Sequence, residues 1–155
     1  MLTRLIIILL VTISVGSAQA QLNTLSFEAV DSSESVEERN TVIFLKTDWC
    51  KYCHKMEQTT LKNEDVVELL NSKFYLVNFD AESERDVVFR GRKFVFKPTG
   101  NNTGVHEIAE QLGTVDGKLN YPAIAIINAK SEIVFQYGGY LSAKELLRVL
   151  IEVKE

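Results

Sequence analysis

The feature that most constrains this chain is a pair of cysteines that follows a strongly β-forming run. Residues 41–45 (TVIFL) are apolar and rich in β-branched and aromatic side chains, which predicts a buried strand. After a short polar stretch, Cys50 and Cys53 occur two residues apart, directly before His54. The residues from Cys50 onward, CKYCHKMEQTTL, lack Gly and Pro, which predicts a helix. The fold must therefore present two thiols where a strand passes into a helix.

This spacing is compatible with two chemistries. C-x-x-C is the pattern of a redox-active dithiol, whereas C-x-x-C-H is also an attachment site for c-type haem. A haem would use His54 as axial ligand and would need a second ligand, for which the mature sequence offers Met56 or His106. The β-run before the motif favours the dithiol, and a haem carrier is the alternative. We expect no metal site, because two cysteines and two distant histidines do not supply the usual four zinc ligands.

The first twenty residues have the pattern of a secretory signal peptide. A short cationic start precedes an uncharged apolar run at residues 5–15, and small residues follow up to Ala20, as in a cleavable leader. We therefore expect an exported chain with one domain at residues 21–155, with membrane contact only through the leader if it is not cleaved. The composition, 46% hydrophobic and 25% charged with a net charge of −4, is that of a globular protein and gives no reason to expect nucleic acid as a partner.

The rest of the chain alternates between helical and strand patterns. Three more strands are predicted at residues 73–80, 121–128 and 133–137, and two more helices at residues 63–71 and 142–153. A further short helix is expected in the acidic stretch before the first strand, with Ser33 or Ser35 as a helix cap. Strands joined through helices should be parallel and strands joined by a short turn antiparallel. The pattern predicts an α/β fold with a mixed sheet and helices on its faces.

Residues 81–120 do not fit this alternation and are interpreted as an insertion. They should contain a β-hairpin that turns near Gly91, a loop at residues 98–104 and a helix at residues 105–112. The first part is rich in cations with a single acidic residue among them, and these are Arg85, Arg90, Arg92, Lys93 and Lys97 around Asp86. Two interpretations stay open for them: a docking surface for a partner, or a solvated hairpin.

The string TDWCKYC after a buried strand, together with a proline at position 122 that opens a later strand, resembles the thioredoxin superfamily. The similarity is to exported bacterial thioredoxin-like proteins with a W-C-x-x-C site, and it covers most of residues 41–155 apart from the insertion. It implies a thioredoxin-like three-layer α/β/α sandwich with a mixed central sheet. It also implies that Pro122 is cis and lies against the sulfurs, that Trp49 shields the disulfide, and that the backbone of Tyr121 pairs with an extended substrate.

The position of the cysteines suggests a role for each. Cys50 lies at the expected helix start, where the helix dipole and free N–H groups stabilise a thiolate. Lys51 and His54 add positive or potentially positive charge, and Tyr52 is expected to tune the dithiol through local packing. Cys53 lies one turn further and can attack a mixed disulfide formed at Cys50. We expect Cys50 to be the exposed nucleophile and Cys53 the buried resolving thiol.

These observations predict a thiol–disulfide oxidoreductase that acts on protein disulfides outside the cytoplasm, as a reductase or isomerase. We expect a monomer in the bacterial periplasm that needs no cofactor beyond its own disulfide and is reduced by a membrane electron donor. A thioredoxin-fold chaperone or adaptor without catalysis is the alternative, beside the haem carrier. One residue departs from the thioredoxin pattern, because Phe44 stands where that pattern has a buried acid. Either water, Lys46 or Glu57 assists proton transfer, or the step is slower.

Overall fold

The computed structural model describes residues 21–154, and the expected signal peptide at residues 1–20 lies outside them. Its centre is a four-stranded sheet in the order β10-β9-β1-β2. These strands are β1 (Asn40–Lys46), β2 (Phe74–Asp80), β9 (Ala123–Ile127) and β10 (Ile133–Gly138). β1 pairs with β2 in parallel and with β9 antiparallel, and β9 pairs antiparallel with β10. The predicted mixed sheet is confirmed.

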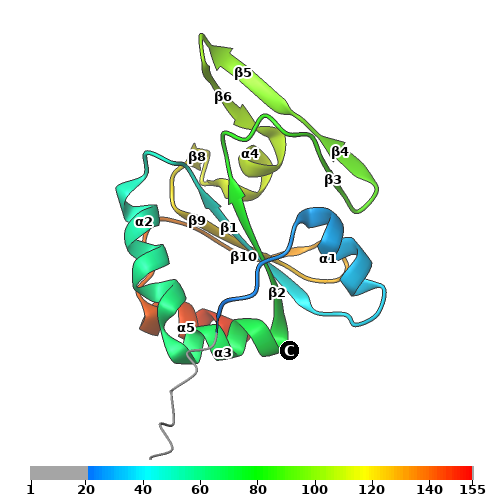
Figure 1. Ribbon diagram of the computed structural model, residues 1–155, viewed down its shortest axis with the longest axis vertical. Coiled ribbons are helices and arrows are strands. Elements are labelled where there is room, and N and C mark those ends of the chain that lie inside the picture. The colour runs from blue at the N-terminus through cyan, green and yellow to red at the C-terminus, as the bar shows by residue number, and fades with distance from the viewer. Residues whose placement is uncertain (1–20, 155) are drawn as a thin grey trace, which may run out of the picture.

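Helices cover both faces of this sheet (Figure 1). They are α1 (Phe27–Glu34), α2 (Lys51–Gln58), η1 (Thr60–Lys62), α3 (Glu64–Lys73), α4 (Glu107–Gly113) and α5 (Ala143–Val153). One buried cluster joins Val42 and Phe44 of β1 to α2, α3 and α5. The other joins Ile43 and Leu45, which point to the opposite face, to α1 and α4. Because both faces of β1 are covered, its apolar run is continuous rather than alternating, and the predicted three-layer sandwich is confirmed.

The ends of two helices test the sequence reasoning about capping. α5 begins as predicted, with a capping box in which Ser142 and Glu145 bond reciprocally. α1 is capped instead by Ser26, whose hydroxyl accepts from the N–H of Ala29 at 3.2 Å. Ser35 is the C-cap of α1 and Ser33 lies in its last turn, so neither serine begins the helix. Both serines bond carbonyl groups of the preceding turn, a local alternative that is open to serine at either end of a helix.

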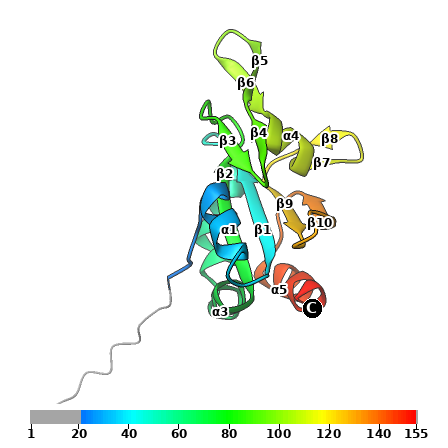
Figure 2. The ribbon, with the colours of Figure 1, turned by 90° about the vertical axis from the view of Figure 1, so that its right-hand side faces the viewer.

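Residues 81–120 form what we call the inserted lobe. It contains β3 (Val87–Phe89), β4 (Arg92–Phe94), β5 (Phe96–Gly100), β6 (Thr103–His106), α4, β7 (Thr114–Val115) and β8 (Lys118–Leu119). The hairpin at Gly91 is confirmed, and Gly91 has a φ of +73°. The expected loop at residues 98–104 is wrong: it belongs to a second hairpin, which projects from the body (Figures 1 and 2). Pro98 is tolerated because a two-stranded ribbon has only edge strands.

The lobe is attached to the sheet at the C-terminal ends of β1 and β2. The N–H of Ala81 donates to the carbonyl of Lys46, and the N–H of His106 donates to the carbonyl of Ala81, both at 2.8 Å. The fully buried His106 ring accepts from the N–H of Ile108 through Nδ1 at 3.3 Å. Its Nε2–H donates to the carbonyl of Arg85 at 3.2 Å. His106 therefore fastens both ends of the first half of the lobe.

Burial favours the neutral form of His106. Burial lowers the pKa of its imidazole, and this outweighs the opposing effects of the hydrogen bond to Arg85 and of the nearby carboxylates of Glu107 and Asp86. Both ring nitrogens already have partners in one neutral tautomer. A proton on Nδ1 would remove the acceptor that caps α4, so the lobe is built around an uncharged histidine.

The cations of the lobe are largely used within the protein. Arg90 donates to the carboxylate of Glu34 at 2.6 Å, and to the carbonyl of Asn128 and the hydroxyl of Ser131, both at 2.8 Å. Lys93 pairs with Asp86, Lys97 with Glu107 and Glu110, and Arg92 bonds Gln111. This pairing favours the solvated-hairpin interpretation over a cationic docking surface. None of the helices within residues 21–154 is long and apolar enough to cross a membrane.

Candidate functional site

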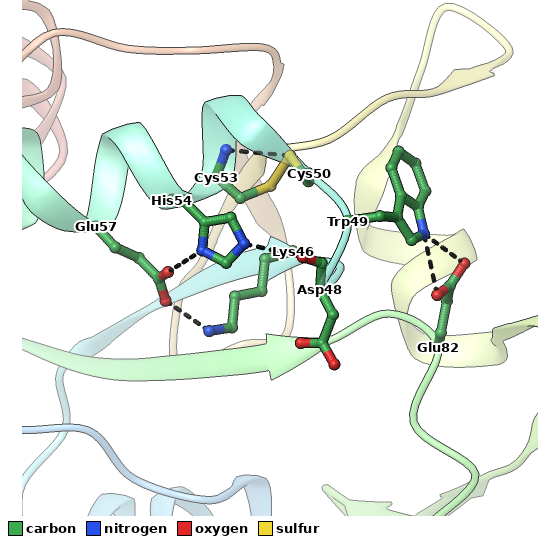
Figure 3. The surroundings of a disulfide bond; sticks show 8 residues. All are labelled: Lys46, Asp48, Trp49, Cys50, Cys53, His54, Glu57 and Glu82. Atoms are coloured by element: carbon green, nitrogen blue, oxygen red, sulfur yellow. Dashed lines mark hydrogen bonds and ion pairs between the residues drawn. A yellow bond between two sulfur atoms is a disulfide. The ribbon is translucent and has the colours of Figure 1, made fainter.

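The two cysteines form a disulfide where β1 passes into α2, as the sequence predicts (Figure 3). β1 ends at Lys46, and the N–H of Cys50 donates to the carbonyl of Thr47 at 3.2 Å, which closes a tight turn. Cys50 is the N-cap of α2, and its Sγ accepts from the N–H of Cys53 at 3.1 Å. A sulfur in this position faces the positive end of the helix dipole and a free donor.

The disulfide is more covered than we expected from the sequence. Cys50 is 5% exposed and Cys53 is fully buried. Cys50 is therefore the more accessible of the two cysteines, as its assigned role requires, but it is not the freely exposed residue that the sequence predicted. The covering comes from packing: both cysteines belong to the buried cluster of α2, α3 and α5, which also contacts Tyr121 and Tyr140.

His54 turns away from the sulfurs and bonds the loop before them. Its Nε2 lies 2.9 Å from the carbonyl oxygen of Asp48, so this nitrogen carries the proton and donates. Its Nδ1 lies 3.6 Å from Oε2 of Glu57. A positive charge on His54 would thus be balanced by the Glu57 carboxylate one turn along α2 (Figure 3). The side chain orients the loop and links it to an acid, in addition to any electrostatic influence on Cys50.

Glu57 is the centre of a polar cluster below the disulfide. Its Oε1 accepts from Nζ of Lys46 at 2.6 Å and from the amide of Asn78 at 3.2 Å. Burial raises the pKa of Glu57, but these two hydrogen bonds and the charges of Lys46 and His54 outweigh burial and hold the pKa below 4.5. Phe44, at the position where the resemblance to thioredoxins implies a buried acid, is buried on β1 and pairs in register with Asn78. A carboxylate is thus present near the site, but on α2 rather than on the strand.

Trp49 lies beside the disulfide and not over it. Its indole is directed toward the inserted lobe (Figure 3), where Nε1–H donates to both carboxylate oxygens of Glu82 at 3.0 and 3.1 Å. The ring also meets Tyr121 edge-on, with 6.1 Å between centroids, and the residue is 65% exposed. The sequence reasoning missed Glu82, because its only signal is that it follows β2 by two positions.

The Tyr121–Pro122 segment reaches the site from the start of β9. The peptide bond between the two residues is cis, and the carbonyl of Pro122 accepts from the N–H of Gly139 at 2.8 Å. Burial, with a contribution from the charges of Glu82 and Asp80, raises the pKa of Tyr121 to about 12. The phenol hydroxyl has no hydrogen-bond partner among residues 21–154. Tyr121 thus lies between the disulfide cluster and the acidic start of the lobe.

A second aromatic pair borders the site on the other side. Tyr52, 62% exposed on the first turn of α2, has its ring centroid 6.5 Å from that of Tyr140. Tyr140 exchanges a hydrogen bond with Thr59 at 3.2 Å, and Nζ of Lys55 lies 4.8 Å from its ring centroid. The sequence reasoning named Tyr52 but missed Tyr140, because only the tertiary fold brings the segment after β10 to α2. Lys51 is exposed on the same first turn.

Residues 21–154 contain no group of three His, Cys, Asp or Glu side chains arranged to hold a metal ion. The groups that surround the sulfurs are a helix N-terminus, an ion-paired carboxylate and two aromatic pairs. This arrangement can stabilise a thiolate at Cys50. Because Cys53 is within disulfide distance on the same helix, the pair can alternate between dithiol and disulfide.

Comparison with solved structures identifies the fold. A thioredoxin from Thermus thermophilus matches with a TM-score of 0.61 and 19% identity, over 85% of this chain and 86% of that one. The DsbH oxidoreductase matches with a TM-score of 0.60 and 17% identity, over 88% of each chain. A protein of Bacteroides thetaiotaomicron proposed to be a disulphide isomerase matches with a TM-score of 0.57 and 22% identity, over 86% of this chain and 93% of that one. At these identities the likeness establishes the architecture.

Sequence comparison points to the same family. Among curated proteins, spermatogenesis-associated protein 20 of Mus musculus is 34% identical over 59 residues, which are 37% of this chain and 8% of that protein. The match thus concerns a small part of a much longer relative. The family model described as a thioredoxin-like domain matches residues 27–154, which include every helix and strand of the structure. The chain therefore belongs to the thioredoxin-like domain family.

Proposed function

We propose that this protein is a thiol–disulfide oxidoreductase that acts on protein disulfides outside the cytoplasm. The single observation that carries the proposal is the position of Cys50, whose sulfur caps α2 and accepts the N–H of Cys53. A thiolate formed there is stabilised by the helix end. The bonded partner, Cys53, is fully buried one turn away, where it is accessible to Cys50 and shielded from other thiols.

The proposed reaction has two exchange steps. The Cys50 thiolate attacks one sulfur of a substrate disulfide, forms a mixed disulfide and expels the other substrate sulfur as a thiolate. The Cys53 thiolate then attacks the Cys50 sulfur, which expels the second substrate sulfur as a thiolate and leaves the Cys50–Cys53 disulfide. Two electrons pass to the substrate, and the protein must afterwards receive two electrons from a donor. The disulfide in the structure corresponds to the oxidised end of this cycle.

The second step requires that Cys53 lose its proton, and we assign the nearby charge cluster to that task. Glu57 follows Cys53 by one helical turn and is ionised at neutral pH, because Lys46 and Asn78 bond its carboxylate. His54 connects this carboxylate to the loop that holds Cys50. We propose that this cluster takes over the task of the buried strand acid whose place Phe44 holds, with Glu57, one helical turn from Cys53 on the same helix, as the proton acceptor.

The proposal also specifies the direction of electron flow and the cellular compartment of the protein. The protein acts as a reductase or isomerase, as a monomer in the bacterial periplasm, and a membrane electron donor keeps its dithiol reduced. Support comes from the leader pattern of the first twenty residues and from the relatedness in fold to proteins named as an oxidoreductase and a disulphide isomerase. A reductase requires a low reduction potential, roughly that of thioredoxin at −270 mV, whereas a strong oxidant lies near −120 mV.

A trapping experiment tests the proposal. Cys53→Ser should accumulate mixed disulfides between Cys50 and substrate proteins, and Cys50→Ser should accumulate none, which non-reducing electrophoresis with mass spectrometry will show. Equilibration with glutathione then gives the reduction potential. If the double cysteine variant complements a deletion as well as the wild type does, the role is that of a binding adaptor and the enzymatic proposal fails. A Soret band in protein matured with haem-attachment machinery would instead support the haem carrier.

A further inference from the structure

The surroundings of the disulfide are polarised, with acidic groups on one side and basic groups on the other. Glu82 lies on the lobe side, and α2 runs from the disulfide in the opposite direction (Figure 3). We call Trp49, Tyr121 and Glu82 the acidic arm, and Tyr52, Lys55 and Tyr140 the basic arm. Each arm holds two aromatic rings and one anchoring charge, so a chain segment that crosses the disulfide would meet both charges.

The acidic arm is held by contacts that leave its charge available. Glu82 is exposed and accepts only a neutral donor, the indole N–H of Trp49. It forms no ion pair within the part of the chain that the structure describes. Asp80 adds a second negative charge, and both carboxylates act on the phenol of Tyr121. The negative potential therefore extends from the lobe to the edge of the cis-proline segment.

The basic arm is built in the same way with the opposite sign. The ammonium group of Lys55 lies over the ring of Tyr140, 4.8 Å from its centroid, a cation–π contact that fixes the charge without neutralising it. Lys55 has no ion pair among residues 21–154, and neither has Lys51 on the same helix. The ring of Tyr140, which carries this charge, lies 6.5 Å from the ring of Tyr52 on the first turn of α2.

Glu145, whose charge acts on the phenol of Tyr140, accepts from both the N–H and the hydroxyl of Ser142, and the other charges near the disulfide pair with one another or point away. Lys46, His54 and Glu57 face one another below α2, and Glu57 therefore balances local cations. The carboxylate of Asp48 points away from the sulfurs (Figure 3). What a bound segment meets across the top of the disulfide is thus a negative group on the lobe side and positive groups on the α2 side.

We propose that this polarity selects the substrate segment: the site favours an extended peptide with a cationic residue on the lobe side of its cysteine and an anionic residue on the α2 side. The inference rests on the proposed function, because it presupposes that Cys50 exchanges disulfides with peptides. Charge complementarity across an interface sets orientation and association rate more than it adds raw affinity. The aromatic rings of both arms would pack against the aliphatic stems of the flanking residues.

Two short blocked peptides of identical composition test the proposal. Each has one central cysteine linked to thionitrobenzoate; one carries lysine before and glutamate after the cysteine, and the other carries them in the opposite order. The Cys50 thiolate of the Cys53→Ser variant attacks the peptide sulfur and expels thionitrobenzoate, whose absorbance reports the rate. We expect the rates to differ by about fivefold at low salt, and the difference to shrink at high salt because exposed charges are screened.

Variants of the two arms test whether their charges cause the rate difference between the peptides. Glu82→Gln keeps an acceptor for Trp49 and Lys55→Gln removes the ammonium, so each should reduce the difference between the peptides. The double reversal Glu82→Lys with Lys55→Glu should invert the preference. The reversal Asp86→Lys with Lys93→Glu exchanges a distant ion pair of the lobe and is the matched control, which should leave the preference unchanged.

The outcomes separate the two proposals. Equal rates for both peptides with the starting variant, or a preference that survives the double reversal, would overturn the polarity proposal alone. If neither peptide reacts with Cys50 faster than with free cysteine, the proposed oxidoreductase function fails as well. A preference that the control pair alters as strongly as the arm reversal would show that the placement of charge elsewhere in the lobe, and not the two arms, decides, and would overturn the polarity proposal.

Discussion

The phenol of Tyr121 gives a quantitative prediction. Its pKa of about 12 exceeds the ordinary value of 10.0 by two units, and each unit corresponds to about 1.36 kcal/mol. Between these two pH values, unfolded chains have lost the phenol proton and folded chains retain it. Stability therefore falls as pH rises through this window. The loss should reach about 1.4 kcal/mol at pH 11 and approach about 2.7 kcal/mol above pH 12.

Tyr121→Phe removes this contribution. Near pH 8 the variant should differ from the wild type by less than about 1 kcal/mol, because the hydroxyl has no partner within residues 21–154 and no hydrogen bond is lost. At pH 11 it should be more stable than the wild type by about 1.4 kcal/mol relative to that baseline. Urea unfolding of the oxidised protein at both pH values measures the difference, and absorbance at alkaline pH follows the phenol directly.

Tyr137→Phe, at an exposed tyrosine of β10, is the matched control for the loss of one phenol. The reasoning is refuted if the difference between the titrations of wild type and Tyr121→Phe has its midpoint near pH 10. It is also refuted if the two proteins lose stability in parallel between pH 8 and pH 11. Either result would mean that the phenol is solvated, and that neither burial nor the charges of Glu82 and Asp80 act on it.

Two further predictions concern the inserted lobe. Because the pKa of His106 is lowered by burial, unfolded chains take up its proton first, and the wild type should lose stability as pH falls below about 6.5. His106→Asn, which keeps an acceptor for Ile108, should flatten this slope in urea unfolding between pH 5 and pH 7. Arg90→Met should lower the free energy of unfolding by about 3 kcal/mol, since it leaves the 14%-exposed carboxylate of Glu34 unpaired. Lys93→Met, at an exposed pair, should cost less than about 1 kcal/mol, and equal losses for the two would contradict the assigned burial.

The core sheet and the cysteine pair were accessible from sequence because their signals are local. The apolar run at residues 41–45 and the capping box at Ser142 need only neighbouring residues to be recognised, and the structure confirms both elements. The second hairpin of the lobe was missed because its signal is not local. Its turn residues at positions 98–104 are typical of a loop, and the strands are held by pairing across that turn.

The side chains that surround the disulfide could be predicted from the sequence only in part. Cys50, Cys53 and Tyr52 are carried by one motif, so their proximity follows from chain connectivity. Glu82 and Tyr140 reach the motif from the ends of β2 and β10, and only the sheet order β10-β9-β1-β2 decides that both segments end beside α2. No periodicity in the sequence encodes such a meeting, because it depends on which strand lies next to which.

The position of Ala81 has a consequence for how this architecture can be altered. The backbone of Ala81 is bonded on one side to β1 and on the other to His106, so the first half of the lobe enters and leaves the domain almost at one point. A segment with such a narrow base could be excised and the chain rejoined without breaking the sheet. Excision would also release the indole of Trp49 from Glu82 and α1 from Arg90. The chain could thus be shortened at this point, but the surroundings of the disulfide would lose residues that they need. A minimal version of this protein would have to replace the contact of Trp49 with Glu82 and the contact of α1 with Arg90.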